Sequence, residues 1–194
     1  TVDKAALTVS ANDARKVYGD ADPTLAYSVN AAQLKYTDAA SVVSGVNLSA
    51  PTGSAATAGT HVVAASGGTA TNYDVTLVNG VLTVEKAALT VSANDARKVY
   101  GDADPTLAYT VNTSQLKYTD AASVVSGVNL STATGAAATA GTHVVAASGG
   151  VAANYAITTA NGTMTVDKAA LTVSADNARK VYGDADPTLG YSVN

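Results

Sequence analysis

The sequence predicts a mostly β (α+β) protein built of tandem antiparallel β-sheet modules of about 82 residues, each with one short helix. The first observation is a long internal repeat. The second is the alternation of apolar and polar residues in short segments, which is typical of half-buried strands. The third is composition: only 13 % of the residues are charged, so Thr, Ser and Asn must supply the polar surface, which suits exposed β-sheet.

The repeat is read directly from the chain. A segment that begins at Lys4 recurs at Lys86 and, with small changes, again at Lys168. The two full copies differ at only fifteen aligned positions. One change, from Leu82 to Met164, preserves volume, as expected of a core position. A repeat of this length is about right for a small autonomous domain.

We therefore expect four segments: residues 1–2 as the tail of a preceding repeat, residues 3–84 and 85–166 as two full modules, and residues 167–194 as part of a third. The last strand of one module reaches the first strand of the next through Glu85, Lys86 and Ala87. Three residues without Gly or Pro do not make a flexible linker. The pattern predicts a semi-rigid rod of consecutive modules.

Within the first module, each strand follows from alternation or from a short apolar run bounded by turn residues. The expected strands are, in order, Ala6–Asn12, Arg15–Tyr18, Leu25–Val29, Val46–Ser49, Thr60–Ala65, Tyr73–Val78 and Val81–Val84. Thr37 as N-cap, Asp38 in the first turn and Gly45 at the end predict one short helix.

The last two strands are separated by Asn79-Gly80, which predicts a two-residue hairpin with a type I′ turn. An antiparallel sheet covered by one helix is β-grasp-like, and this is the architecture we expect. An Ig-like β-sandwich is the alternative. A helix over Thr37–Gly45 fits a sandwich poorly, so the sandwich ranks second.

Composition excludes several functions. The net charge is −4, and the eleven Lys and Arg residues form no basic stripe, so we expect no nucleic acid partner. No run of 18 apolar residues is present, so we expect no membrane insertion. Without Cys there is no thiol nucleophile and no Cys-based metal site. We expect no cofactor, no catalytic residue and no enzyme, since a catalytic site is rarely repeated along a chain.

The remaining candidates for a site are acidic and aromatic residues. Carboxylates two residues apart in a loop can share Ca²⁺, but these also close turns by binding backbone N–H groups, and we favour that role. The Ca²⁺ candidates are Asp20, Asp22, Asp102 and Asp104. One His per copy, His61 or His143, is too few for a metal site, and we expect ordinary strand residues.

Tyrosine is the only large aromatic residue of the chain, so it must supply the bulky packing. We expect Tyr18 and Tyr73 in the core. Tyr36 and its counterpart Tyr118 stand among polar residues before the predicted helix. A tyrosine ring can stack on a sugar, and these two are the candidate ligand-binding residues.

In fixed order, three pieces resemble the MBG family of bacterial repeats, of the YGX and YDG types: Lys16–Asp20, Asn72-Tyr73 and Val78–Val84. The resemblance covers the chain twice in full and once in part. It implies tandem arrays in large secreted or surface-anchored adhesins, an extracellular or cell-surface location, and no catalytic residues. The segment Ala31–Tyr36 departs from the family pattern, which leaves the start of the helix undefined.

Two hypotheses for function follow. The first is a structural stalk or fibre segment of a large extracellular bacterial adhesin or biofilm matrix protein. It would contact other repeats of the same chain or neighbouring copies, and self-association into filaments is one form of it. The second is a weak carbohydrate- or Ca²⁺-binding module acting by avidity, with cell-surface or matrix polysaccharide as partner.

Overall fold

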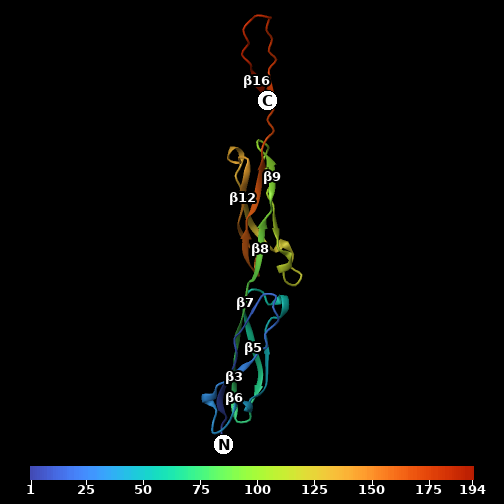
Figure 1. The fold of residues 1–194 in the computed structure, drawn as a ribbon. Helices are drawn as coiled ribbons and strands as arrows, with labels where there is room; N and C mark the ends of the chain where they lie inside the picture. Colours follow the sequence, from blue (N-terminus) through green and yellow to red (C-terminus); the bar gives the residue numbers. More distant parts are fainter. The chain divides into compact units, whose positions relative to one another are not determined.

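A computed structural model describes residues 1–194. It contains sixteen strands and six single-turn 3₁₀ helices, and no α-helix. Figure 1 shows the course of the chain through the strands. The mostly β class and the tandem repeat of about 80 residues are therefore confirmed. The strand prediction is also confirmed in number, because seven strands lie in each full repeat.

The first repeat has two sheets, in the orders β3-β1-β6 and β2-β7-β5-β4. Its strands are β1 (Ala5–Ala11), β2 (Ala14–Val17), β3 (Tyr27–Val29), β4 (Ser44–Ser49), β5 (Gly59–Thr69), β6 (Tyr73–Val78) and β7 (Gly80–Glu85). Its 3₁₀ helices are η1 (Ala31–Gln33), η2 (Ala40–Val42) and η3 (Gly53–Ala55).

The chain crosses from one sheet to the other between consecutive strands. The chain passes from β1 to β2 and, later, from β6 to β7. β1 pairs with β6 in parallel, with Leu7 opposite Val75. β2 pairs with β7 in parallel, with Lys16 opposite Val84. The sheets are thus mixed, and the prediction of purely antiparallel sheets was wrong for these two pairs.

The hairpin predicted at Asn79-Gly80 was also wrong, because β6 and β7 belong to different sheets. Neither residue has the positive φ that a type I′ turn requires. Gly80 is needed for close approach instead, since a Cβ there would lie 2.6 Å from the carbonyl oxygen of Ala11. Asn79 Oδ1 accepts a hydrogen bond from Ala65 N at 3.0 Å. Asn-Gly marks a change of sheet here.

The helix predicted over Thr37–Gly45 is reduced to the single turn η2, so no helix covers a sheet as in the expected β-grasp-like unit. Asp38 does not stabilise a helix start, because its Oδ2 accepts from the Tyr73 hydroxyl at 2.8 Å. Val43 is β-branched and buried, and the chain enters β4 directly after it. Tertiary packing outweighs the helix signals at this segment.

The second repeat has the same strand orders, β10-β8-β13 and β11-β12-β14-β9. Its elements are β8 (Ala87–Ala93), β9 (Ala96–Val99), β10 (Tyr109–Val111), η4 (Thr113–Gln115), η5 (Ala122–Val124), β11 (Ser126–Ser131), η6 (Gly135–Ala137), β12 (Gly141–Val151), β13 (Tyr155–Ala160) and β14 (Gly162–Asp167). The remaining strands, β15 (Val173–Ala175) and β16 (Tyr191–Val193), pair antiparallel.

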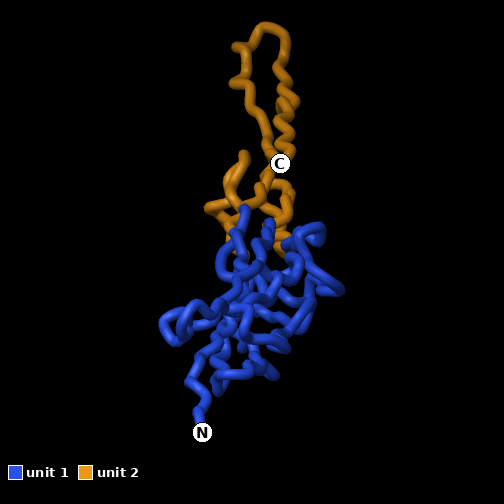
Figure 2. Tube along the Cα trace, turned by 90° about the horizontal axis from the view of Figure 1, so that it is seen from below, with its two compact units in different colours: residues 1–92, 109–129, 147–160 blue, residues 93–108, 130–146, 161–194 orange.

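By packing, the chain divides into two compact units, which Figure 2 colours separately. The first is residues 1–92, 109–129 and 147–160, and the second is residues 93–108, 130–146 and 161–194. This division differs from the division into sequence repeats, which stays a prediction. The prediction that Leu82 and its counterpart Met164 occupy a core position is confirmed, because both side chains are fully buried.

Candidate functional site

Side chains of the two repeats pack against one another inside the first compact unit. One hydrophobic cluster there contains Tyr18, Leu82 and Val84 of the first repeat together with Leu89 and Tyr155 of the second. The apolar core therefore continues across the boundary between the two repeats. A second cluster, around Leu7, Val9 and Tyr73, belongs to the first repeat alone: Leu7, Val9, Val43, Ala70 and Tyr73.

Tyr18, directly after β2, packs against the second repeat and is only 2 % exposed. Its ring meets Tyr118 edge-on with centroids 5.4 Å apart, and Tyr155 edge-on at 5.6 Å. Edge-to-face pairs at these distances are favourable. The Tyr18 hydroxyl donates to Asp120 Oδ2 at 3.2 Å. The burial predicted for Tyr18 and Tyr73 is confirmed.

The surface that receives Tyr18 is held by its own hydrogen bonds. The Tyr155 hydroxyl donates to Asp120 Oδ2 at 2.7 Å and accepts from Lys117 N at 2.8 Å. Asn154 Oδ1 accepts from Ala58 N, across the repeat boundary, at 3.0 Å. We call the set Tyr118, Asp120, Asn154 and Tyr155 the tyrosine socket.

Two backbone features shape this contact. Tyr118 adopts φ 52°, the left-handed region that side chains other than Gly rarely occupy. Gly19, directly after Tyr18, has φ 91°, and a Cβ there would lie 2.3 Å from Lys117 Cγ. A tyrosine followed by glycine therefore fits the socket, whereas a bulkier second residue would collide with it.

The environment of the socket alters tyrosine acidity. Burial, followed by the hydrogen bond to Asp120, raises the pKa of Tyr155 to about 12. Burial and the charge of Asp120 also raise the pKa of Tyr18. Both hydroxyls thus stay protonated and donate to the same carboxylate oxygen. Asp120 therefore holds Tyr18 of the first repeat and Tyr155 of the second together through hydrogen bonds from two neutral hydroxyls.

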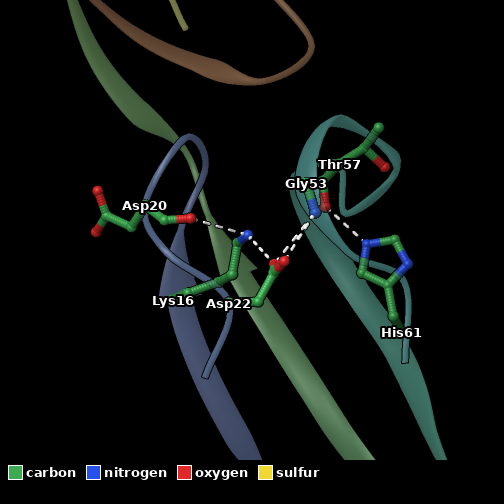
Figure 3. Close-up of polar contacts among 6 residues, drawn as sticks. All are labelled: Lys16, Asp20, Asp22, Gly53, Thr57 and His61. Atoms are coloured by element: carbon green, nitrogen blue, oxygen red, sulfur yellow. Dashed lines mark hydrogen bonds and ion pairs between the residues drawn. The ribbon is translucent and has the colours of Figure 1, made fainter. Parts of the chain in front are cut away.

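The loop after Tyr18 carries two of the Ca²⁺ candidates, and Figure 3 shows where they lie. Asp22 Oδ1 is 2.7 Å from Lys16 Nζ, and both Asp22 oxygens accept from Gly53 N. Asp20 contributes its backbone oxygen to Lys16 Nζ at 3.1 Å, while its carboxylate points away (Figure 3). The Lys16 ammonium thus lies beside Asp22.

These contacts account for the pKa directions of the pair. The hydrogen bond from Lys16, with that from Gly53 N, lowers the pKa of Asp22. Burial, the largest single influence, would lower the pKa of Lys16, but the hydrogen bonds and charges of Asp22 and Tyr118 together outweigh it, so the pKa of Lys16 is raised. A buried ammonium in this position needs its carboxylate partner.

The second compact unit repeats the loop. Lys98 Nζ is 2.6 Å from Asp104 Oδ1 and donates to the backbone oxygen of Asp102 at 3.1 Å. Gly135 N donates to Asp104 Oδ2 at 3.4 Å. The hydrogen bond from Lys98 lowers the pKa of Asp104. In both copies, then, the second Asp closes the loop by an ion pair and a backbone hydrogen bond.

The other candidates are the two histidines and the tyrosines Tyr36 and Tyr118, of which Tyr118 belongs to the socket. His61 Nε2 is 2.7 Å from the Thr57 carbonyl oxygen, and His143 Nε2 is 2.7 Å from that of Thr139. No group of three or more His, Asp or Glu residues that could hold a metal ion is present in residues 1–194. Tyr36 is fully exposed, whereas Tyr118 is 46 % exposed.

Sequence reasoning named Tyr118 of the socket and Asp22 of the loop as candidates but missed their partners. Lys16, Asp120 and Asn154 were not proposed as site residues, although each recurs at the same place in both full copies. A signal for Lys16 was available: it follows the alternation of β2 onto the buried side, where an unpaired ammonium is unfavourable. Asp120 and Asn154 gave no such signal, because they act on a neighbouring repeat.

The class defined by these observations is a tandem β-sheet repeat whose copies pack through their cores. A family description, the MBG domain (YGX type), matches residues 7–83 and 89–165, and the chain belongs to this family. Neither the curated proteins nor the solved structures contain a match to the chain. None of its helical segments has the length and apolar character needed to cross a membrane.

Proposed function

We propose that this chain is a structural stalk or fibre segment of a large extracellular bacterial adhesin or biofilm matrix protein. The chain is a tandem array of MBG domains, and its role is to space or connect, without catalysis. The observation that carries the proposal is the hydrophobic cluster shared by the two repeats. A connection with its own buried core resists bending, because bending exposes apolar surface to water.

The short connection between the repeats supports the same role. Only Lys86 separates β7 from β8. The backbone on each side is also held, with Tyr18 N donating to Glu85 O at 2.8 Å and Ala87 N donating to Asn154 O at 3.0 Å. A flexible linker would have neither these hydrogen bonds nor such a length. Consecutive repeats joined in this manner keep a defined spacing.

Small-angle X-ray scattering of the 194-residue chain tests the proposal. A compact globular protein of this length has a radius of gyration of about 16 Å. We expect a clearly larger value and a scattering curve with the slope of a rod. Tyr18→Ala is the matched variant, and it should broaden the distribution of distances. A radius of gyration close to that of a compact globular protein would contradict a stalk.

The extracellular location needs its own measurement. Antibodies raised against the chain should label intact, unpermeabilised cells of the source organism or the matrix between them. Labelling that appears only after permeabilisation would contradict a surface or matrix location. It would not by itself contradict a spacing role inside the cell.

A further inference from the structure

The first repeat carries its own copy of the tyrosine socket on its surface. A hollow there is lined by the four residues that correspond to the socket, Tyr36, Asp38, Asn72 and Tyr73. Lys4 and Lys35 also line it. These are the positions that lie one repeat before Tyr118, Asp120, Asn154, Tyr155, Lys86 and Lys117.

The hollow has the same internal hydrogen bonds as the socket. The Tyr73 hydroxyl donates to Asp38 Oδ2 at 2.8 Å and accepts from Lys35 N at 2.8 Å. Ala5 N donates to Asn72 O at 3.0 Å, as Ala87 N does to Asn154 O. Because these contacts match those around Tyr155, the hollow is organised before anything docks into it, which lowers the entropy lost on binding.

Backbone and exposure complete the comparison. Tyr36 has φ 53°, and Tyr118 has φ 52°. The unusual backbone is thus present in both copies, whether or not another tyrosine packs against it. The difference is exposure: Tyr36 is 103 % exposed and Tyr118 is 46 %. The exposed ring of Tyr36 is the surface that Tyr18 covers on Tyr118.

We propose that this hollow is a docking site for the Tyr-Gly turn of a second copy of the repeat, joined in line ahead of residue 3. The incoming tyrosine meets Tyr36 and Tyr73 edge-on and donates its hydroxyl to Asp38. Asn72 Oδ1 accepts a backbone N–H of the incoming repeat. The occupant is identified by continuity with the contact already described, in which Tyr18 and Gly19 fill the matching socket.

This inference deepens the proposed function by naming the partner surface, and it rests on that function only in requiring repeats joined end to end. It assigns Tyr36, the candidate ligand-binding residue, to contact with another repeat. A sugar ring stacking on Tyr36 is the competing occupant, and the experiment below separates the two.

The test uses an extended chain in which a copy of residues 2–83 is placed directly ahead of Val2. This join reproduces the order Thr-Val-acidic residue-Lys found at Thr83–Lys86. Nitration of exposed tyrosines, read by mass spectrometry of peptides, reports on Tyr36. Tyr118, 46 % exposed, and Tyr182, 103 % exposed, are internal references in the same molecule.

We expect Tyr36 to react like Tyr182 in the original chain. In the extended chain its reactivity should fall to the level of Tyr118, which is less than half as exposed. Tyr18→Ala in the added copy should restore the high reactivity. Tyr36→Ala in the added copy is the matched control, because that position lies at the far end of the added repeat, and it should leave the protection unchanged.

Tyr18→Phe in the added copy keeps the ring and removes the hydroxyl, so it should retain most of the protection even where the alanine variant unfolds the added repeat. If Tyr36 stays as reactive as Tyr182 in the extended chain, the proposal is overturned. It is also overturned if a polysaccharide protects Tyr36 equally in the original and extended chains. The scattering of the original chain decides the stalk role separately.

Discussion

Tyr18 and Tyr100 stand in the same short sequence, from Lys16 to Asp22 and from Lys98 to Asp104, yet they differ sharply in burial. Tyr18 is 2 % exposed, and Tyr100 is 48 % exposed. The backbone at both is the same, because each donates its N–H to the end of the neighbouring strand at 2.8 Å. The turn is therefore formed by the repeat itself.

The lysine two residues before each tyrosine, in contrast, is equally buried in both copies. Lys16 is 6 % exposed and Lys98 is 8 % exposed, so both are buried, each with its own carboxylate. The comparison separates two kinds of contact in one short sequence. The Lys-Asp pair belongs to the repeat, whereas the burial of the tyrosine depends on the surface that meets it.

The largest expected effect comes from removing the two tyrosines. Tyr18→Ala should lower the free energy of unfolding by about 3 to 4 kcal/mol, because it deletes a buried aromatic ring from the shared cluster. Tyr100→Ala should lower it by only about 1 kcal/mol, because half of that ring is already in water. Denaturant unfolding of the full chain, with hydrogen exchange to locate the change, measures both. Equal losses would remove the distinction drawn above.

Alkaline pH should weaken the tyrosine socket next. The pKa of Tyr155 is raised to about 12 from an ordinary value of 10.0, so its stabilisation is complete below pH 10 and is lost as the pH rises to about 12. A shift of this size corresponds to roughly 2 to 3 kcal/mol. Unfolding curves between pH 9 and pH 12 measure the loss. The Tyr155→Phe variant should show a shallower dependence, and an unchanged slope would contradict this assignment.

A smaller effect is expected at the two glycines of the turns. Gly19→Ala and Gly101→Ala both place a side chain at a positive φ, of 91° and 93° respectively, at roughly 1 to 2 kcal/mol each. Only Gly19 lies against Lys117, whereas nothing lies within 4 Å of a Cβ at Gly101. Gly19→Ala should therefore be the more destabilising of the two by thermal unfolding. The reverse order would argue against a close fit at the socket.

The smallest effect is expected at acid pH, and here the two copies should agree. The pKa values of Asp22 and Asp104 are both lowered from 3.8 by hydrogen bonds from lysine. Their stabilisation is present above pH 3.8 and is lost as the pH falls through the lowered values. Carboxyl titration by NMR should place both midpoints below 3.8. A normal midpoint at only one of them would show that the loops differ.

Alternation predicted the strands of each repeat well, because apolar and polar residues alternate along a half-buried strand. The boundaries of β1 agree to within one residue, from Ala6–Asn12 predicted to Ala5–Ala11 found. Local rules failed where distant residues decide. Asn79-Gly80 reads as a hairpin, but contact with Ala11 and Asn12 turns it into a change of sheet. Thr37–Gly45 reads as a helix, but Tyr73 takes the Asp38 carboxylate.

The site was predictable only in part. The expectation that Tyr18 is buried followed from composition, since the chain has no Phe or Trp and tyrosine is its only large aromatic residue type. That Tyr18 enters the next repeat did not follow, because its partners Asp120 and Tyr155 lie far along the chain, beyond the end of its own repeat. The positions of Asp120 and Tyr155 depend on how the chain passes between the two sheets of its repeat, and no local sequence pattern predicts that path.

The parallel pairing of β1 with β6 and of β2 with β7 has a mechanical consequence. The first repeat begins at β1 and ends at β7. Tension on its two ends therefore pulls β1 and β2 one way and β6 and β7 the other, along the strand direction. The hydrogen bonds between β1 and β6 and between β2 and β7 then bear the load together, in shear, instead of opening one by one. Single-molecule pulling on the chain should accordingly give high rupture forces, with each repeat yielding abruptly.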